Sequence, residues 1–401
     1  MNVEITILRI GRGTLTALVA GAMSLALAAQ PSAPRSQTPQ QPKAATIQIT
    51  TASPQARAFF EHGLAKMETL HWEAALSEWR DAAKADPNFA LAHAFLAELS
   101  RDPVEQVAER DKAIATRKFA GAEEKLVIDW IVNSSQSHWV PAIQAMNEAL
   151  ADYPQDKYLA WLSGLWLTNQ RQSERAIPLF ERANQLDPKF ADPLNQAAYC
   201  YARLGDFNKA FADMQRYAEL LPNEANPQDS FAEISRLAGR FNDSLEHYRA
   251  SLKIDPSFID SQAGLGDTYA VMGEEEKARA EYDIAIAHAT TRVESVNYSL
   301  QRAATWAREQ NFAKADAEYQ QIAQAAHERG LGNLEAEAWR RMSVYQTDSR
   351  KATQMLSTAK DVLKHPHQMS AAAREQELAL ILRTRVGHSV HNGNMKDALA
   401  S

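Results

Sequence analysis

The stretch LDPKF, Leu186 to Phe190, has the composition of a helix end, and it has two close relatives in the chain. They are ADPNF (Ala85 to Phe89) and IDPSF (Ile254 to Phe258). Proline cannot continue a helix, and it biases the preceding residue away from helical backbone angles. The prolines at 154, 188, 222 and 256 lie 34 residues apart, and Pro87 lies 67 residues before the first of them, nearly two such units. This spacing predicts a series of helix–turn–helix units, each with a second helix that ends before the proline and a phenylalanine that tucks into the neighbouring unit.

A small side chain recurs in phase with these prolines, and a large side chain follows it after four residues. The small residues are Ala75, Ala142, Ala176, Ala210, Ser244, Ala278 and Ala315, and the large ones are Trp79, Met146, Phe180, Met214, Tyr248, Tyr282 and Tyr319. Residues four apart share one helix face. On the other helix of each pair the small positions are Gly63, Gly164, Ala198, Ala232, Gly266 and Ala303. Small residues admit a neighbouring helix and large ones fill the space beyond the crossing, so we expect the paired helices to nest.

Two features depart from this phase. Trp130 occupies a position that should be small, and the interval from Ala278 to Ala315 is 37 residues. The turns between paired helices nevertheless share one plan in LGDFNKA (Leu204 to Ala210) and AGRFNDS (Ala238 to Ser244). The glycine of each turn can take the left-handed conformation that ends a helix.

These residues and spacings resemble the tetratricopeptide repeat family over most of residues 56–330. The resemblance implies an all-α, right-handed superhelical solenoid of antiparallel helix pairs, with about eight to nine repeats. We place the repeat array at 51–369, with a charged and looser pair between 90 and 122 and a further pair over 333–364. Residues 370–401 are predicted to form C-terminal capping helices or a tail.

The first residues do not fit the repeat. Arg9 and Arg12 precede an uncharged apolar run from Thr14 to Ala29, which is shorter than a typical membrane span and ends in small residues. We interpret 1–29 as a signal peptide, with an uncleaved anchor as the alternative, and the Pro/Gln-rich segment 30–50 as a disordered linker. The protein is then expected to be exported, either periplasmic or secreted, and to reach the inner membrane only through an uncleaved leader.

One further resemblance supports a bacterial cell-envelope setting. LLPNEANPQDSFAEI, Leu220 to Ile234, is similar to a stretch found in exported, uncharacterised bacterial repeat proteins.

Composition and motifs give no sign of catalysis. The net charge of -7 offers no general attraction to nucleic acid, and the single Cys200, expected to be a buried thiol, excludes an intramolecular disulfide. The sequence motifs of serine hydrolases, phosphate-binding loops and zinc proteases are absent. His365 with His367 and His388 with His391 have no neighbouring cluster of carboxylates, so we interpret them as solvated. We therefore predict no catalytic residue, cofactor or metal site.

In the family, the first helices of the pairs line a concave face that holds a peptide or a helix of a partner. The resemblance places nine residues of this chain on that face: Tyr158, Trp161, Asn195, Tyr199, Arg203, Asp229, Glu233, Arg236 and Asp267. Their mixed charged, amide and aromatic groups suit peptide recognition, and a merely solvated face is an equal alternative. Most tryptophans fall at core positions, but Trp161 is out of phase with the small residue Gly164.

The predicted function is a non-enzymatic protein–protein interaction scaffold in the bacterial cell envelope. The alternative is the repeat platform of an envelope enzyme, or a carbohydrate- or metabolite-binding factor. That alternative requires an inserted segment, and nearly all residues from 56 to 364 fit the repeat phase. A transcriptional sensor is a weaker third hypothesis because no DNA-binding segment is visible.

Overall fold

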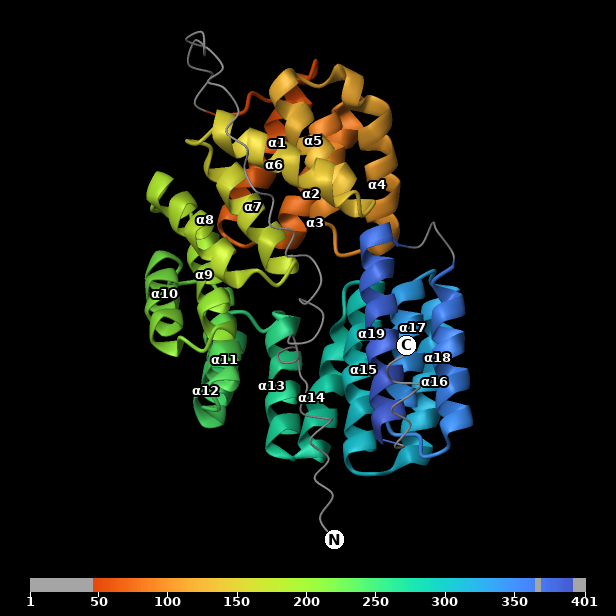
Figure 1. The fold of residues 1–401 in the computed structure, drawn as a ribbon. Helices are drawn as coiled ribbons and strands as arrows, with labels where there is room; N and C mark the ends of the chain where they lie inside the picture. The colour runs from red at the N-terminus through yellow and green to blue at the C-terminus, as the bar shows by residue number, and fades with distance from the viewer. Residues whose placement is uncertain (1–45, 365–368, 392–401) are drawn as a thin grey trace, which may run out of the picture.

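The computed structural model describes residues 46–364 and 369–391, and within them the regular structure is helical (Figure 1). The predicted leader at 1–29 lies outside this part, and so does most of the predicted linker. In chain order the helices are α1 (Pro54–Glu68), α2 (Trp72–Ala85), α3 (Ala90–Leu99), α4 (Pro103–Thr116), α5 (Ala122–Ser135), α6 (Trp139–Asp152), α7 (Lys157–Asn169), α8 (Ser173–Leu186), α9 (Asp192–Arg203), α10 (Phe207–Leu220), α11 (Asn226–Leu237), α12 (Phe241–Ile254), α13 (Ile259–Met272), α14 (Glu275–His288), α15 (Arg292–Arg308), α16 (Phe312–Glu328), α17 (Gly332–Ser343), α18 (Ser349–Val362) and α19 (Ala371–His391). A short 3-10 turn, Arg117–Phe119, follows α4.

Consecutive helices pair from α1 with α2 to α17 with α18, so the described residues form nine hairpins, each packed on the next. This confirms the predicted all-α solenoid of helix pairs. The pair expected between 90 and 122 is α3 with α4, and it is not loose, because Ala90 to Ala97 are all buried in the core. At the C-terminal end, α19 packs on α17 and α18. None of the described helices combines the length and the apolar character needed to cross a membrane.

The helix ends follow the predicted signals. The second helices α6, α8, α10 and α12 end two residues before the prolines at 154, 188, 222 and 256. Gly205 and Gly239 have φ of 82° and 76°, the left-handed conformation that closes a helix without strain at glycine. The Phe190 ring lies 5.8 and 5.9 Å from the rings of Tyr158 and Trp161 on α7, the first helix of its own hairpin, and Phe190 belongs to the same buried cluster as Ala197 and Cys200 of α9.

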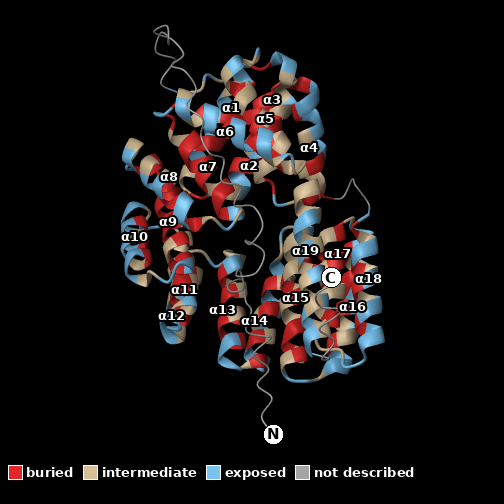
Figure 2. Ribbon diagram, viewed as in Figure 1, coloured by how far each residue is buried: buried red, intermediate tan, exposed pale blue. Residues whose placement is uncertain are grey.

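The paired helices nest as the small and large residues predict. A Cβ atom added to Gly63 would lie 2.3 Å from the Trp79 indole, and one added to Gly164 would lie 2.6 Å from the Phe180 ring. At Gly266 it would lie 2.7 Å from the Tyr282 ring. These separations are too short for real carbon contacts, so only glycine permits the observed approach. Figure 2 shows the resulting core as buried segments along the facing sides of the helices.

The two irregular joints are accommodated in different ways. Trp130 on α5 is fully buried and lies edge-on to Trp166 of α7 at 6.3 Å, while Trp139 of α6 lies 6.5 Å from the same ring. The large side chain is therefore held in a cluster of three indoles. The interval of 37 residues is taken up by a longer first helix, because α15 has 17 residues where the preceding first helix α13 has 14.

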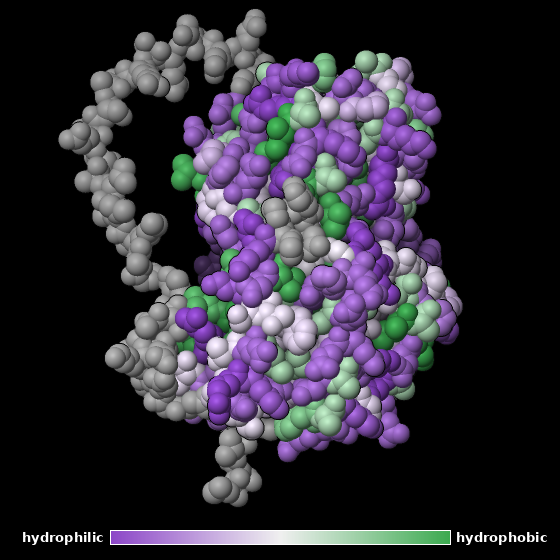
Figure 3. Space-filling model, turned by 90° about the vertical axis from the view of Figure 1, so that its right-hand side faces the viewer, coloured by the Kyte–Doolittle hydropathy of each residue, from purple (hydrophilic) through white to green (hydrophobic). Residues whose placement is uncertain are grey.

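The array curves so that helices near the C-terminal end come close to helices near the N-terminal end. Figure 1 shows this where α15 and α19 lie below α4. The contact, which we call the seam, joins Arg101 and Asp102 in the α3–α4 connection to Asp260, Arg292 and Glu294. The Arg292 guanidinium donates to Asp102 at 2.6 Å, and Arg101 lies 3.9 Å from both Asp260 and Glu294. In addition, α19 contacts α5. The side of the molecule that carries α4 and α18 is mainly hydrophilic, with hydrophobic residues scattered over it (Figure 3).

Candidate functional site

Five of the predicted face residues lie together on the first helices α9, α11 and α13, and four of them are connected by hydrogen bonds and ion pairs. We call this set the polar ladder: Tyr199, Asp229, Glu233, Arg236 and Asp267. The Tyr199 hydroxyl of α9 donates to Glu233 of α11 at 2.9 Å. Arg236, one helical turn further along α11, lies 3.6 Å from Glu233 and 3.5 Å from Asp267 of α13. The ladder therefore links three successive hairpins through their side chains.

The ladder extends through residues of the next hairpins. Asp229 accepts a hydrogen bond from the Ser261 hydroxyl at 2.7 Å, and Asp260 accepts one from Tyr298 of α15 at 2.9 Å. Burial raises the pKa of Asp229 well above its usual range, and the nearby negative charge of Asp260 adds to this effect. Two carboxylates, those of Glu233 and Asp267, share the single guanidinium of Arg236 on this surface.

Tyrosines from the second helices complete this polar layer. Tyr248 of α12 passes Gly264, where an added Cβ would lie 2.2 Å from the Tyr248 ring. Tyr282 of α14 passes Gly266, and its hydroxyl donates to Asp267 at 2.7 Å. The glycines allow rings of the second helices to reach through to the first-helix side.

Sequence reasoning treated these tyrosines as packing residues only. The type of residue at the large position could have indicated their polar role. This position holds Phe180 and Met214 in the middle of the array, but it holds tyrosine at 248, 282 and 319. A buried tyrosine hydroxyl needs a hydrogen-bond partner, and the change from phenylalanine or methionine to tyrosine indicates a polar layer behind the core.

Trp161 is a correction to the predicted face. Its side chain is fully buried, its indole N–H donates to Asp192 at the start of α9, and its ring stacks on Trp72 at 6.1 Å. Because α9 begins directly against α7, the indole fills the joint between hairpins and is not available to a partner.

The other predicted residues divide among three environments. Tyr158 lies apart from the ladder, where its hydroxyl donates to Glu68 at the end of α1. Asn195 is only 4% exposed, so it lies behind the surface. Arg203, the last residue of α9, is exposed, and within the described chain no acceptor forms a hydrogen bond or ion pair with it. The nine residues therefore do not form one surface.

The described residues contain no group of three histidine, cysteine or acidic side chains arranged to hold a metal ion. Cys200 is a buried thiol, as predicted, and its sulfur lies 3.4 Å from the Thr168 hydroxyl. His388 is half-buried and not fully solvated as predicted, and burial lowers the pKa of its imidazole. His365 and His367 lie outside the described residues.

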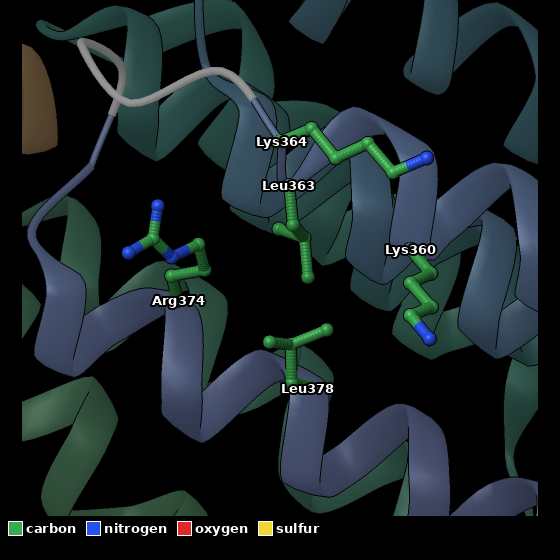
Figure 4. A pocket seen from close by; sticks show the side chains of 5 residues that line it. All are labelled: Lys360, Leu363, Lys364, Arg374 and Leu378. Atoms are coloured by element: carbon green, nitrogen blue, oxygen red, sulfur yellow. The ribbon is translucent and has the colours of Figure 1, made fainter.

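A hollow of about 330 Å³ lies between the end of α18 and the start of α19 (Figure 4). Leu363 and Leu378 face each other across it, while the charged ends of Lys360, Lys364 and Arg374 point away from the two leucines. Lys364 is paired with Asp361 at 2.6 Å. None of the predicted site residues lines this hollow.

Comparisons with known proteins place the fold. No protein-family model matches the chain. An 86-residue stretch, 21% of the chain, is 33% identical to the anaphase-promoting complex subunit CDC16 of Saccharomyces cerevisiae, and it covers 10% of that protein. The chain thus matches about a tenth of the length of this curated relative.

Solved structures match over a greater length. Yeast Tom70 aligns with a TM-score of 0.50 at 14% identity, over 80% of this chain and 67% of its own. The APC/C hetero-tetramer Cut9–Hcn1 aligns at 0.47 and 14% identity, over 86% and 64%. A tetratricopeptide repeat protein from Parabacteroides merdae aligns at 0.45 and 12% identity, over 76% and 98%.

Proposed function

Because this chain is a helical-hairpin solenoid with the tetratricopeptide-repeat fold, we propose that it is a non-enzymatic scaffold that binds a partner polypeptide against the polar ladder. The observation that carries the proposal is the continuity of the ladder, in which Tyr199, Glu233, Arg236 and Asp267 are linked across three hairpins. Such a row of fixed donors and acceptors matches the repeating polar groups of a peptide or a helix.

The charged groups of the polar ladder indicate which side chains the partner segment would carry. Glu233 and Asp267 flank the single Arg236, so two carboxylates share one guanidinium, and lysine or arginine side chains of the partner would pair with the ladder. Arg203 at the end of α9 is exposed, and it would pair with an acidic group at one end of the same segment. Exposed charge pairs of this kind are weakened by salt, so capture should decline as ionic strength rises.

The ladder can be tested with variants that keep its shape. We expect Glu233→Gln with Asp267→Asn to weaken partner binding at least about a hundredfold, so that cross-linked recovery from an envelope extract falls sharply, since each of the two lost charged hydrogen bonds is worth about 1.5–3 kcal/mol. Arg203→Glu should act in the same direction. Reversal at Arg236 is unsuitable because it would place a third acid between Glu233 and Asp267.

Glu246→Gln is the matched control, because Glu246 is an exposed acid on the second helix α12, and it should leave capture unchanged. Circular dichroism melting verifies that the variants remain folded. Equal recovery by the ladder double variant and the unsubstituted protein, or no partner with bait at either terminus, would reject the ladder as the binding surface.

A location in the bacterial cell envelope is the second part of this proposal. It is supported by the basic residues Arg9 and Arg12, the apolar run that follows, and its small-residue end. Mass spectrometry of the protein purified from its host should find the mature N-terminus directly after Ala28 or Ala29. A peptide beginning at Met1 in the membrane fraction would favour the anchor, and one in the cytoplasmic fraction would contradict export.

A further inference from the structure

The residues directly before α1 are bound to the first four hairpins. We call this segment, Thr46 to Ser53, the strap. The backbone N–H of Ile47 donates to Asp156 at 2.9 Å, and that of Thr50 donates to Glu124 at 2.8 Å. The carbonyl of Ile49 accepts a hydrogen bond from Arg57 at 2.6 Å. The prediction of a disordered linker through residue 50 is therefore wrong for its last residues.

The strap lies in the manner of an extended peptide ligand. Thr46, Gln48 and Thr50 are exposed, whereas Ile47 and Ile49 are half-buried and pack against the core of the first hairpins. In an extended chain, alternate side chains point to opposite sides. The strap therefore turns one aliphatic side toward the helices and one polar side away from them.

Ile47 and Ile49 line an open groove of about 400 Å³ together with residues of the first helices α1, α3, α5 and α7. Its apolar walls include Phe60, Leu91, Phe95, Val127 and Leu162. Side chains larger than isoleucine at the same two positions would bury more apolar surface in this groove.

The two carboxylates that accept hydrogen bonds from the strap are buried, and backbone N–H groups at helix starts hold them in place. Asp156 is 6% exposed; one of its oxygens accepts from Tyr158 and Leu159 at the start of α7, while the other accepts from Ile47. Glu124 is fully buried and divides its oxygens in the same way between Gly121 and Thr50. Each carboxylate thus holds one oxygen ready for a backbone N–H of an extended chain.

We propose that this groove is a second polypeptide-binding site, which takes an extended partner segment with aliphatic or larger apolar side chains at alternate positions. The strap is its resident occupant in the free protein, and the partner segment displaces it. The strap shows that the groove accepts an extended chain with aliphatic side chains at alternate positions. The open space in the groove allows a partner with bulkier apolar side chains to bind more tightly than the strap. This site uses α1, α3, α5 and α7, whereas the polar ladder uses α9, α11 and α13.

The proposal can be tested by releasing the strap in the full-length chain and offering its sequence as a separate peptide. Ile47→Asp with Ile49→Asp places two charges against the apolar walls and should free the groove. A fluorescein-labelled peptide of residues 43–53, KAATIQITTAS, is then titrated and followed by anisotropy. We expect the released variant to bind at least ten times more tightly than the unsubstituted protein, where the strap competes. The peptide with phenylalanine in place of both isoleucines should bind more tightly still, and the peptide with aspartate at both should not bind.

Asp156→Asn in the released variant tests the acceptor. Asparagine keeps an oxygen for the cap of α7, but it presents an amide donor to the peptide N–H, so affinity should fall several-fold. Asp348→Asn is the matched control, because Asp348 caps α18 in the same way far from the groove, and it should change nothing. If the double aspartate variant loses its helical circular dichroism, Thr50→Pro releases the strap instead by removing the N–H that meets Glu124.

Equal affinity of the released and unsubstituted proteins, no binding by a folded released variant, or no effect of Asp156→Asn would each overturn the proposal. Glu233→Gln with Asp267→Asn should leave peptide affinity unchanged, so the outcome does not depend on whether the polar ladder binds a partner.

Discussion

Replacing Gly164 by valine should destabilise the array by about 3 kcal/mol, at the upper end of what overpacking a core costs. A Cβ at this position would lie between 2.6 and 2.8 Å from three atoms of the Phe180 ring. That ring is fully buried, so it cannot move aside without displacing its own neighbours. The urea midpoint measured by circular dichroism, compared with that of the unsubstituted protein, reports the loss.

The matched control is Gly387→Ala in α19, because a Cβ there meets no atom within 4 Å. Alanine is a better helix former than glycine, so this substitution should stabilise the helix by about 0.5–1 kcal/mol. If Gly164→Val and Gly387→Ala shifted the urea midpoint equally, close approach at the small positions would not be what holds the hairpins together.

Asp192→Asn should stabilise the protein by about 2–3 kcal/mol at pH 7.5 and change little at pH 4. Asp192 is fully buried, and it accepts hydrogen bonds from the Trp161 indole and from Gln196. Burial raises the pKa of this carboxyl from its ordinary 3.8 to about 6, although these hydrogen bonds act in the opposite direction. Each unit of pKa shift corresponds to about 1.4 kcal/mol.

The sign follows from proton binding. Between pH 4 and 6 the folded protein holds a proton on Asp192 that the unfolded chain has lost. Stability therefore falls as the pH rises through this window, and the full loss is reached above pH 6. Asparagine is neutral at every pH and keeps an oxygen for the indole N–H, and its amide N–H can donate to the oxygen of the Gln196 side chain once that amide turns over, so it removes the loss.

Urea midpoints of both proteins at pH 4 and pH 7.5 measure this difference. Asp361→Asn is the control, since the side chain of Asp361 is 59% exposed, and it should show no such dependence on pH. A constant difference between Asp192→Asn and the unsubstituted protein at both pH values would show that the Asp192 charge does not limit stability.

The hairpins and their nesting could be predicted from local signals. Proline and glycine act on the backbone at their own positions, and residues four apart face the same way on any helix. The second helices therefore end where the 34-residue spacing places them, and Gly164 meets Phe180 as its phase requires. These rules need no knowledge of the distant chain, so they held for nearly every unit.

The partners of the face residues could not be predicted in this way, because they depend on which helices meet. Trp161 is removed from the surface by Asp192, 31 residues later, and nothing in the sequence around Trp161 signals this contact. Tyr199 and Glu233 are one repeat period apart, so the sequence places them on the same face, but the hydrogen bond between them depends on how closely α9 packs on α11.

The amino-acid sequence by itself determined the unit: where each helix ends, which of its sides is buried, and that units stack. The tertiary structure alone decided which distant hairpins of the array come into contact. It brought Arg292 to Asp102 across 190 residues and Ile47 to Asp156 across 109. The physical reason is that a small rotation at every hairpin joint accumulates along the array, so the contacts between distant units depend on all the joints between them.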